Sequence, residues 1–229
     1  MVAVPVVLRA APPLVRREVV LGRSALGRPI VAWEVGNPGS RRVVLVVGCI
    51  HGDEPAGIAV ASALAHQAVP SRLLLWVVPD LNPDGVAAGT RQNARGVDLN
   101  RNFPWRWRPT GPRGSTYYAG SGAASEPETR IALRLLRHVR PLVSIWFHQH
   151  LDVVDLSGGD AGVERRFARH VRMRLLRLAR YPGSAVNWEN HELRGSTAFV
   201  VELPAGPLPK SRAHSFVGAI DETLDPPGP

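Results

Sequence analysis

The chain is poor in the residues that cross-linked or membrane-spanning proteins need. Cys49 is its only cysteine, so no disulfide can form within the chain and its stability must come from a packed core. No apolar run approaches the roughly 20 residues of a membrane span. Met1–Leu14 is apolar but lacks the basic start and the cleavage site of a secretory signal. We therefore expect a soluble, cytoplasmic protein that does not enter a membrane.

Lysine is equally scarce. Lys210 is the only lysine among 28 Lys and Arg residues, and the formal net charge is +9. Such an excess could serve a nucleic-acid-binding face or simply a solvated surface. We favour the solvated surface and expect no nucleic-acid partner, although an anionic substrate would be attracted to it.

What the chain does contain is an alternation of apolar runs and helical patterns. Its 229 residues, 45% of them hydrophobic, suit a single domain over 1–229 with a substantial core. Strands are predicted at 18–21, 29–35, 43–47, 73–78, 142–147 and 197–201. Helices are predicted at 56–65, after a capping box at Ser125–Glu128, at 163–180 and at 212–224. The alternation predicts an α/β fold with a mostly parallel sheet.

A short polar turn follows the buried run Val43–Val47. Within it, His51 and Glu54 are three residues apart, and in a first helical turn they would face the same way. An imidazole and a carboxylate so placed can bind one zinc ion, as in catalytic sites with two His, one Glu and a water. The spacing alone is common at helix starts, so the rest of the chain must supply the other ligand.

Other polar residues also follow predicted strands. Asn82, Asp84, His148 and Glu202 each lie just after an apolar run. Ligand sites in open α/β sheets lie outside the carboxyl ends of the strands. The sequence therefore predicts that these side chains meet His51 and Glu54 at one edge of the sheet.

The stretch 91–104, which contains Asp-Leu-Asn-Arg-Asn-Phe, favours a zinc site over the simpler interpretation of polar residues at a helix start. Together with His-Gly-Asp-Glu upstream, Asn-Pro-Asp-Gly between them and Ser-Glu-Pro-Glu downstream, it resembles the zinc carboxypeptidases in order and spacing. The resemblance covers about residues 17–205. It implies a three-layer α/β/α sandwich around a mixed, mostly parallel sheet, with one Zn2+ ion per chain.

The resemblance also implies a role for individual residues. His51, Glu54 and a later strand-end histidine would bind zinc. His148 fits that third position, and His150 is the rival. Glu202 matches the catalytic glutamate, which moves the proton of the attacking water, and Arg91 matches the arginine that stabilises the oxyanion.

Substrate binding is assigned in the same way. Asn100 and Arg101 match the pair that grips a terminal carboxylate. Tyr181 is the only tyrosine near the position of the family's mobile tyrosine, but the loop here is short, and it could equally be a packed helix-end residue. The segment 185–191 should shape the side-chain pocket, where Glu189 could pair with a substrate amine or be solvated.

The expected activity is that of a zinc metallocarboxypeptidase or amidase, a metalloprotease-type hydrolase acting next to a free carboxylate. The substrate would be a small peptide. The compact bacterial members look closest, which suggests murein peptides and their γ-D-glutamyl-diaminopimelate bond. Two alternatives are an N-acyl-amino-acid deacylase of the aspartoacylase or succinylglutamate desuccinylase type, and a binding module on an inactive enzyme fold.

Overall fold

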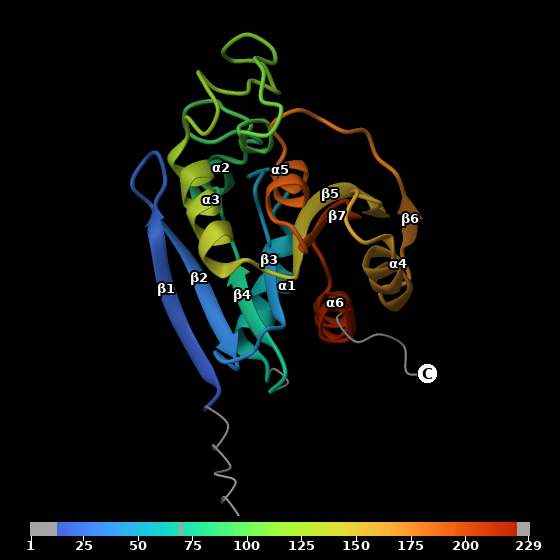
Figure 1. The fold of residues 1–229 in the computed structure, drawn as a ribbon. Helices are drawn as coiled ribbons and strands as arrows, with labels where there is room; N and C mark the ends of the chain where they lie inside the picture. Colours follow the sequence, from blue (N-terminus) through green and yellow to red (C-terminus); the bar gives the residue numbers. More distant parts are fainter. Residues whose placement is uncertain (1–12, 69–70, 224–229) are drawn as a thin grey trace, which may run out of the picture.

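The strands form one seven-stranded sheet in a computed structural model that describes residues 13–68 and 71–223 (Figure 1). The order is β1-β2-β4-β3-β5-β6, and β7 pairs with β5. The pairs β1–β2 and β2–β4 are antiparallel and the others are parallel. The bounds are β1 Val15–Arg23, β2 Pro29–Gly36, β3 Val43–Val47, β4 Leu74–Val78, β5 Val143–Asp155, β6 Arg174–Leu176 and β7 Thr197–Pro204.

Helices cover both faces of this sheet. Helices α1 (Ala56–His66), α4 (Ala161–His170) and α6 (Lys210–Thr223) pack on one face. Helices α3 (Pro127–Val139) and α5 (Ala185–Glu192) pack on the other, and α2 (Pro83–Ala88) lies in the connection after β4. The predicted three-layer α/β/α sandwich with a mixed, mostly parallel sheet is confirmed.

The central strands are apolar on both sides because both sides are covered. In β3, Val44 and Val46 belong to the core under α1, whereas Leu45 and Val47 belong to the core under α3 and α5. Successive side chains of a strand point to opposite faces, so a strand buried between two helical layers reads as a continuous hydrophobic run. This is why the central strands could be predicted.

The predicted helix over 163–180 is wrong in its second half. Helix α4 ends at His170, Arg172 takes a left-handed backbone (φ 54°), and β6 then pairs with Val153–Asp155 of β5. The apolar spacing suits a helix as well as it suits a short strand. The open edge of β5 decides, because its backbone groups need partners and local propensity yields to that tertiary pairing.

The predicted capping box at Ser125–Glu128 is also wrong. The N-cap of α3 is Glu126. The Glu128 carboxylate is buried and instead accepts the backbone N–H of Ala25 (2.8 Å) and the side-chain amide of Asn93 (3.0 Å). A fully buried carboxylate gains more from these two long-range donors than from the local backbone.

Strand β5 is longer than the predicted 142–147, and it changes course. His148 lies opposite Glu202 and His150 opposite Pro204, but further on Val153 lies opposite Glu202 again and Val154 opposite Val201. The chain therefore turns near Leu151 and runs back along β7. The consequence is that residues after the turn approach the same region as His148.

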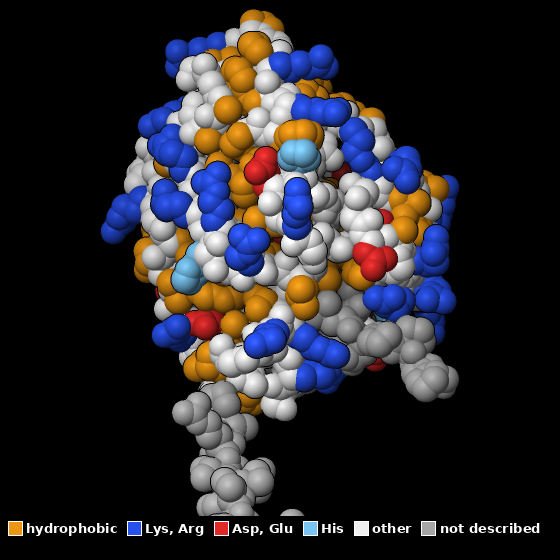
Figure 2. All heavy atoms as spheres, viewed as in Figure 1, with side chains coloured by type: hydrophobic (Ala, Val, Ile, Leu, Met, Phe, Trp, Pro, Cys, Tyr) orange, Lys and Arg blue, Asp and Glu red, His pale blue; other side chains and the backbone are white. Residues whose placement is uncertain are grey.

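Two further findings concern the surface and the termini. Arginine and lysine side chains are spread over the face shown in Figure 2 rather than gathered in one patch. No helix in the described residues is long and apolar enough to cross a membrane. Apart from Pro13 and Leu14, the expectations for Met1–Leu14 lie outside the described residues, as does the last residue of the helix predicted at 212–224.

Candidate active site

The turn after β3 carries His51 and Glu54. The backbone N–H of Glu54 donates to the His51 carbonyl (3.0 Å), and α1 begins only at Ala56. The two residues therefore lie in a turn before the helix. The sequence analysis had considered them in the first turn of the helix instead. Gly52 makes this turn possible, because a Cβ there would come within 1.9 Å of the Gly85 backbone.

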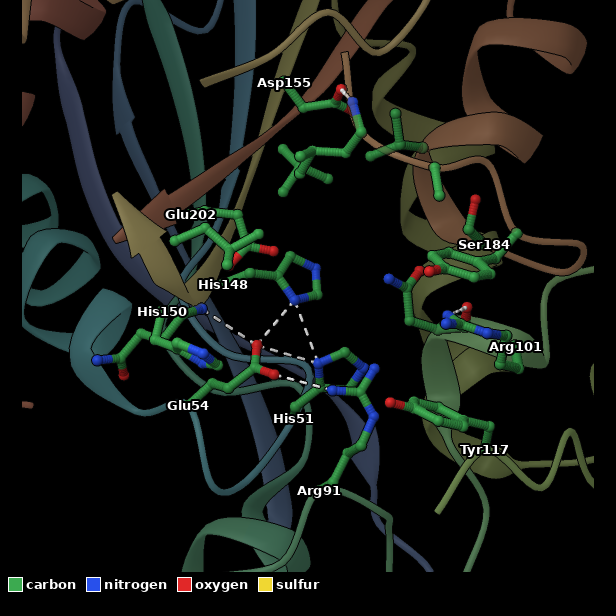
Figure 3. Close-up of a pocket in the computed structure, with 18 of the residues that line it drawn as sticks. His51, Glu54, Arg91, Arg101, Tyr117, His148, His150, Asp155, Ser184 and Glu202 are labelled. Atoms are coloured by element: carbon green, nitrogen blue, oxygen red, sulfur yellow. Dashed lines mark hydrogen bonds and ion pairs between the residues drawn. The ribbon is translucent and has the colours of Figure 1, made fainter. Parts of the chain in front are cut away.

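Three ligand-type atoms meet at this turn (Figure 3). Glu54 Oε2 lies 3.1 Å from His51 Nδ1 and 2.9 Å from His148 Nδ1, and the two Nδ1 atoms are 3.1 Å apart. Zinc bonds of about 2.0–2.1 Å place tetrahedral ligands roughly 3.3 Å apart. The three side chains could therefore hold one metal ion. His150 lines the cavity but is exposed and is not part of this group.

Asp98 fixes the orientation of His51. Its Oδ1 lies 3.0 Å from His51 Nε2. Burial would raise the pKa of Asp98, but the neighbouring His51, Arg91 and Arg101 hold it below its usual range. An ionised carboxylate only accepts, so Nε2 carries the proton and Nδ1 keeps its lone pair for a metal. The sequence interpretation missed this role of Asp98.

The acidic and basic groups around the cluster influence one another. Burial alone would lower the pKa of His51, but Asp98 and Glu54 more than offset that effect and raise it. Burial alone would raise the pKa of Glu54, yet the neighbouring His148 and His51 side chains lower it strongly. Glu54 is thus held as a carboxylate, the form that binds a cation.

Glu202 faces the cluster from β7. It lies opposite His148 in the strand register and lines the same cavity. Its Oε2 atom is buried and has no hydrogen-bond partner among the described residues. Burial raises the pKa of Glu202, helped by the Glu54 carboxylate and opposed by His148. A buried carboxylate oxygen without a hydrogen-bond partner destabilises the fold. We therefore expect Glu202 to have a role other than packing.

Arg91 lies at the other side of the cluster. Its Nη1 is 2.9 Å from Glu54 Oε1, and its Nε is 3.0 Å from Asp98 Oδ2. The guanidinium thereby forms part of the cavity wall directly beside the metal-type group.

Arg101 is a buried cation that its neighbours neutralise only in part. It is 6% exposed, and its Nη1 lies 3.9 Å from Asp98 Oδ2, a carboxylate that His51 and Arg91 share. Burial lowers the pKa of Arg101 and so does Arg91, with Asp98 opposing them. A guanidinium remains charged nonetheless, so a bound anion would complete this end of the cavity.

Two tyrosine rings flank this guanidinium. The Tyr181 ring centre lies 4.1 Å from Arg101 Cζ and the Tyr117 ring centre 5.5 Å, within cation–π range. Tyr181 is 50% exposed and follows a loop, so it is not a packed helix-end residue. Tyr117 was missed by the sequence interpretation, although tyrosines are few (three in the chain).

One cavity of about 590 Å³ brings eight of the nine predicted site residues together. Asn100 also lines it, and its side-chain oxygen accepts the N–H of Ala185 at 2.9 Å, which ties the loop to α5. The eight are His51, Glu54, Arg91, Asn100, Arg101, His148, Tyr181 and Glu202.

Glu189 is the exception, and its expected contact with a substrate amine is wrong. The residue is fully buried on the sheet side of α5. Its carboxyl accepts hydrogen bonds from Ser144 Oγ, from Trp146 Nε1 (3.2 Å) and from Ser196 Oγ (3.2 Å). Burial raises its pKa to about 7, with these three donors opposing the rise. The periodicity of α5 turns this position into the core, whereas Val186 and Asn187 face the cavity.

Comparison with known proteins agrees with this geometry. Residues 6–161 match the sequence profile described as zinc carboxypeptidase. The chain belongs to the zinc carboxypeptidase family. Members of this family depend on zinc, and His51, Glu54 and His148 could bind one ion.

Murein peptide amidases A are among the similar members of the zinc carboxypeptidase family. The one from Escherichia coli K12 is 34% identical over 145 residues, which cover 58% of this chain and 60% of that protein. The one from Vibrio campbellii is 31% identical over 197 residues, covering 80% of this chain and 77% of its own length. The match to the Escherichia coli protein thus spans less than two thirds of that protein.

Solved zinc carboxypeptidase structures show the same fold. Murein-tripeptide amidase from Escherichia coli O157 superimposes with a TM-score of 0.74 at 27% identity, over 96% of this chain and 95% of its own. Carboxypeptidase A from Helicoverpa armigera gives a TM-score of 0.79 at 18% identity, over 91% and 68% of the two chains. At that lower identity the likeness extends to the fold alone.

Proposed function

We propose that the protein is a zinc-dependent carboxypeptidase or amidase that hydrolyses an amide bond beside a residue with a free carboxylate. The observation that carries this proposal is the content of one cavity. A metal-type group, a carboxylate with an unpaired oxygen and a buried arginine all line it. Each supplies one of the parts that such a hydrolysis requires.

In this proposal His51, Glu54 and His148 hold one zinc ion. Bound zinc lowers the pKa of a water molecule and polarises the scissile carbonyl. Asp98 keeps the His51 ring in the orientation and tautomer that binding needs, through its 3.0 Å contact to Nε2.

Glu202 moves the proton. Its carboxylate accepts a proton from the attacking water as the water oxygen bonds to the carbonyl carbon. It then delivers that proton to the amide nitrogen as the carbon–nitrogen bond breaks. The products are a carboxylic acid and an amine, and Glu202 returns to its starting state. Its unpaired Oε2 is the atom free to do this.

The arginines bind the charges of substrate and intermediate. Arg91, beside the cluster, stabilises the oxyanion that forms on the carbonyl oxygen. Arg101 and Asn100 bind the free carboxylate, with the guanidinium offering two parallel donors. Tyr181 covers this position, since its ring lies 4.1 Å from Arg101 Cζ.

The substrates we propose are murein peptides. The support comes from the family members named above, which include murein peptide amidases of bacteria. These relatives do not favour the alternative hypothesis of an N-acyl-amino-acid deacylase. We further propose that the enzyme consists of one domain over 1–229. We also propose that it is cytoplasmic, because a single cysteine is compatible with a reducing compartment.

The test is a hydrolysis screen on purified protein with and without a metal chelator. The substrates are a murein tripeptide, the same tripeptide amidated at the free carboxylate, an ordinary dipeptide and an N-acyl amino acid. We expect chelator-sensitive cleavage of the free tripeptide only or foremost. Cleavage of the N-acyl amino acid with no activity on peptides would overturn the proposal in favour of a deacylase.

A further inference from the structure

An ion pair lies at the end of the cavity away from Arg91. Asp155 Oδ2 is 2.6 Å from Arg180 Nη1, and both residues line the cavity. Figure 3 shows Asp155 on the far side of His148 from Arg91. Asp155 is 3% exposed, whereas the Arg180 side chain is 33% exposed. Neither residue has a part in the hydrolysis described above.

The return of β5 along β7 brings Asp155 to this place. Ser157 Oγ donates to Asp155 Oδ2 (2.7 Å) and accepts the N–H of Val200 (3.1 Å), which fixes the carboxylate beside β7. The N–H of Leu178 donates to Oδ1 (2.8 Å). The ion pair is therefore held by the backbone at a fixed point in the cavity.

Aliphatic residues line the same cavity, among them Leu178, Ala179, Val186 and Val200. A cavity that combines aliphatic residues with one fixed anion and one cation suits a substrate side chain with a methylene stem and a charged tip. Glu189, the acid expected to meet such a side chain, lies in the core instead.

Both charged groups keep capacity for a ligand. A carboxylate has about four acceptor positions, and Leu178, Ser157 and Arg180 occupy three on Asp155. A guanidinium has about five N–H donors, and Arg180 uses three, on Asp155 and on the carbonyls of Leu156 and Leu178. A ligand could thus add one contact to each without breaking the pair.

We infer that Asp155 and Arg180 select a substrate residue whose side chain ends in both an ammonium and a carboxylate, the chemistry of diaminopimelate. The ammonium would contact Asp155 and the carboxylate Arg180, so every charge would have an opposite neighbour. A lysine side chain would bring an ammonium to Arg180 without its own anion, and this like-charge contact would reject it. The inference rests on the proposed function and assigns its side-chain selectivity to two residues of the cavity wall.

A purely structural ion pair is the competing explanation, since Arg180 also donates to the carbonyls of Leu156, just after β5, and of Leu178 in its own loop. The two explanations differ in substrate selectivity. A structural pair would affect all substrates alike when removed, whereas a recognition pair would change the ratio between substrates that differ only in the side chain. The ratio of kcat/KM values is therefore the quantity to measure.

The experiment uses three tripeptides, L-Ala-γ-D-Glu-X, in which X is diaminopimelate, lysine or 2-aminopimelate. Lysine lacks the side-chain carboxylate and 2-aminopimelate lacks the side-chain amine. We expect the protein to prefer diaminopimelate over each by roughly tenfold or more, about 1.4 kcal/mol per tenfold. Asp155→Asn should shrink the preference over 2-aminopimelate, and Arg180→Gln the preference over lysine. Arg177→Gln, in the same loop but exposed and outside the cavity, should leave both ratios unchanged.

Each outcome bears on a different claim. Equal kcat/KM for the three tripeptides in the unsubstituted protein would overturn this inference and leave the proposed function intact. No cleavage of any tripeptide would overturn the proposed function and the inference with it. Equal losses on all three substrates in Asp155→Asn and in Arg180→Gln would show a structural pair only. If one variant fails to fold, the ratios of the other variant, compared with those of the unsubstituted protein, still decide.

Discussion

Two glutamates, one half-buried in the cavity wall and one fully buried in the core, have different roles. Glu202 on β7 and Glu189 on α5 both have a pKa raised chiefly by burial. Glu202 has one oxygen with no partner among the described residues, whereas Glu189 accepts three hydrogen bonds from side chains. The two glutamates differ in their hydrogen-bond partners as well as in burial, since Glu189 is fully buried and Glu202 is half-buried.

The comparison separates a working group from a structural one. A closed hydrogen-bond network fixes a core and costs much to open. An unpaired buried oxygen is destabilising and is kept only where the surroundings hold it. We therefore expect substitutions around Glu202 to change chemistry at little cost in stability, and substitutions at Glu189 to do the reverse.

The largest expected effect concerns the metal group that Glu202 faces. His148→Ala removes one of three ligands, so zinc retained after dialysis should fall from about one ion per chain to near zero, and activity with it. Metal analysis by mass spectrometry measures this directly.

His150→Ala is the matched control, since His150 lies two residues further along β5 and is exposed. It should retain zinc. Loss of zinc in His150→Ala but not in His148→Ala would exchange the two assignments.

The next effect is on turnover. Glu202→Gln keeps the shape of the side chain but cannot accept the proton, so kcat should fall about a hundredfold to ten-thousandfold, the range typical of general acid–base catalysis. Zinc content and melting temperature should stay close to those of the unsubstituted protein. Normal turnover would remove Glu202 from the mechanism, and Glu192→Gln, at an exposed site, serves as the control.

A smaller effect is expected at the carboxylate end. Arg101→Ala removes a charge-assisted contact worth about 2–4 kcal/mol, so kcat/KM should fall by roughly two orders of magnitude or more. Arg101→Lys retains the charge without the fork and should lose less. A substrate amidated at its carboxylate should be cut poorly by the unsubstituted protein. If it is cut as fast as the free acid, Arg101 does not recognise a carboxylate.

The smallest effect concerns stability and tests the structural role of Glu189 in the core. The Glu189 pKa is about 7 in the folded chain, against an ordinary value of 4.5 for a glutamate. Between these values the folded protein holds a proton that the unfolded chain releases, so rising pH lowers the free energy of unfolding, by about 3 kcal/mol at most. Below about pH 4.5 this contribution is fully present, and above about pH 7 it is lost.

Glu189→Gln should remove that slope. Its amide oxygen can face Trp146 Nε1 while the hydroxyls of Ser144 and Ser196 turn to accept from the amide nitrogen. Urea unfolding at about pH 5 and about pH 8 measures the slope in both proteins. An unchanged slope would mean that the Glu189 carboxyl does not titrate in this window. A large loss of kcat in Glu189→Gln without a change in stability would contradict the purely structural role of Glu189.

The sequence by itself determined the layers of the fold and the polar groups at the strand ends. A short continuous apolar run such as Val43–Val47, bounded by turn residues, is typical of a strand buried on both faces, and the motifs from His51 to Glu202 identify the family. Their roles in zinc binding and catalysis stay predictions. Of the eight residues that the structure gathers in one cavity, four follow strands whose carboxyl ends share one edge: His51, Glu54, His148 and Glu202. The other four were named from the family resemblance: Arg91, Asn100, Arg101 and Tyr181.

Only the tertiary structure decided which partner each polar group would find. Helical spacing could not show that β6 would leave α4 to pair with β5, or that Glu128 would bond to Ala25 and Asn93. Nor could it show that α5 would turn Glu189 into the core while β5 doubled back to bring Asp155 into the cavity. The physical reason is that a periodic pattern records which face of an element is apolar. Hydrogen-bond and ion-pair partners come from distant segments, and their positions are set only when the whole chain packs.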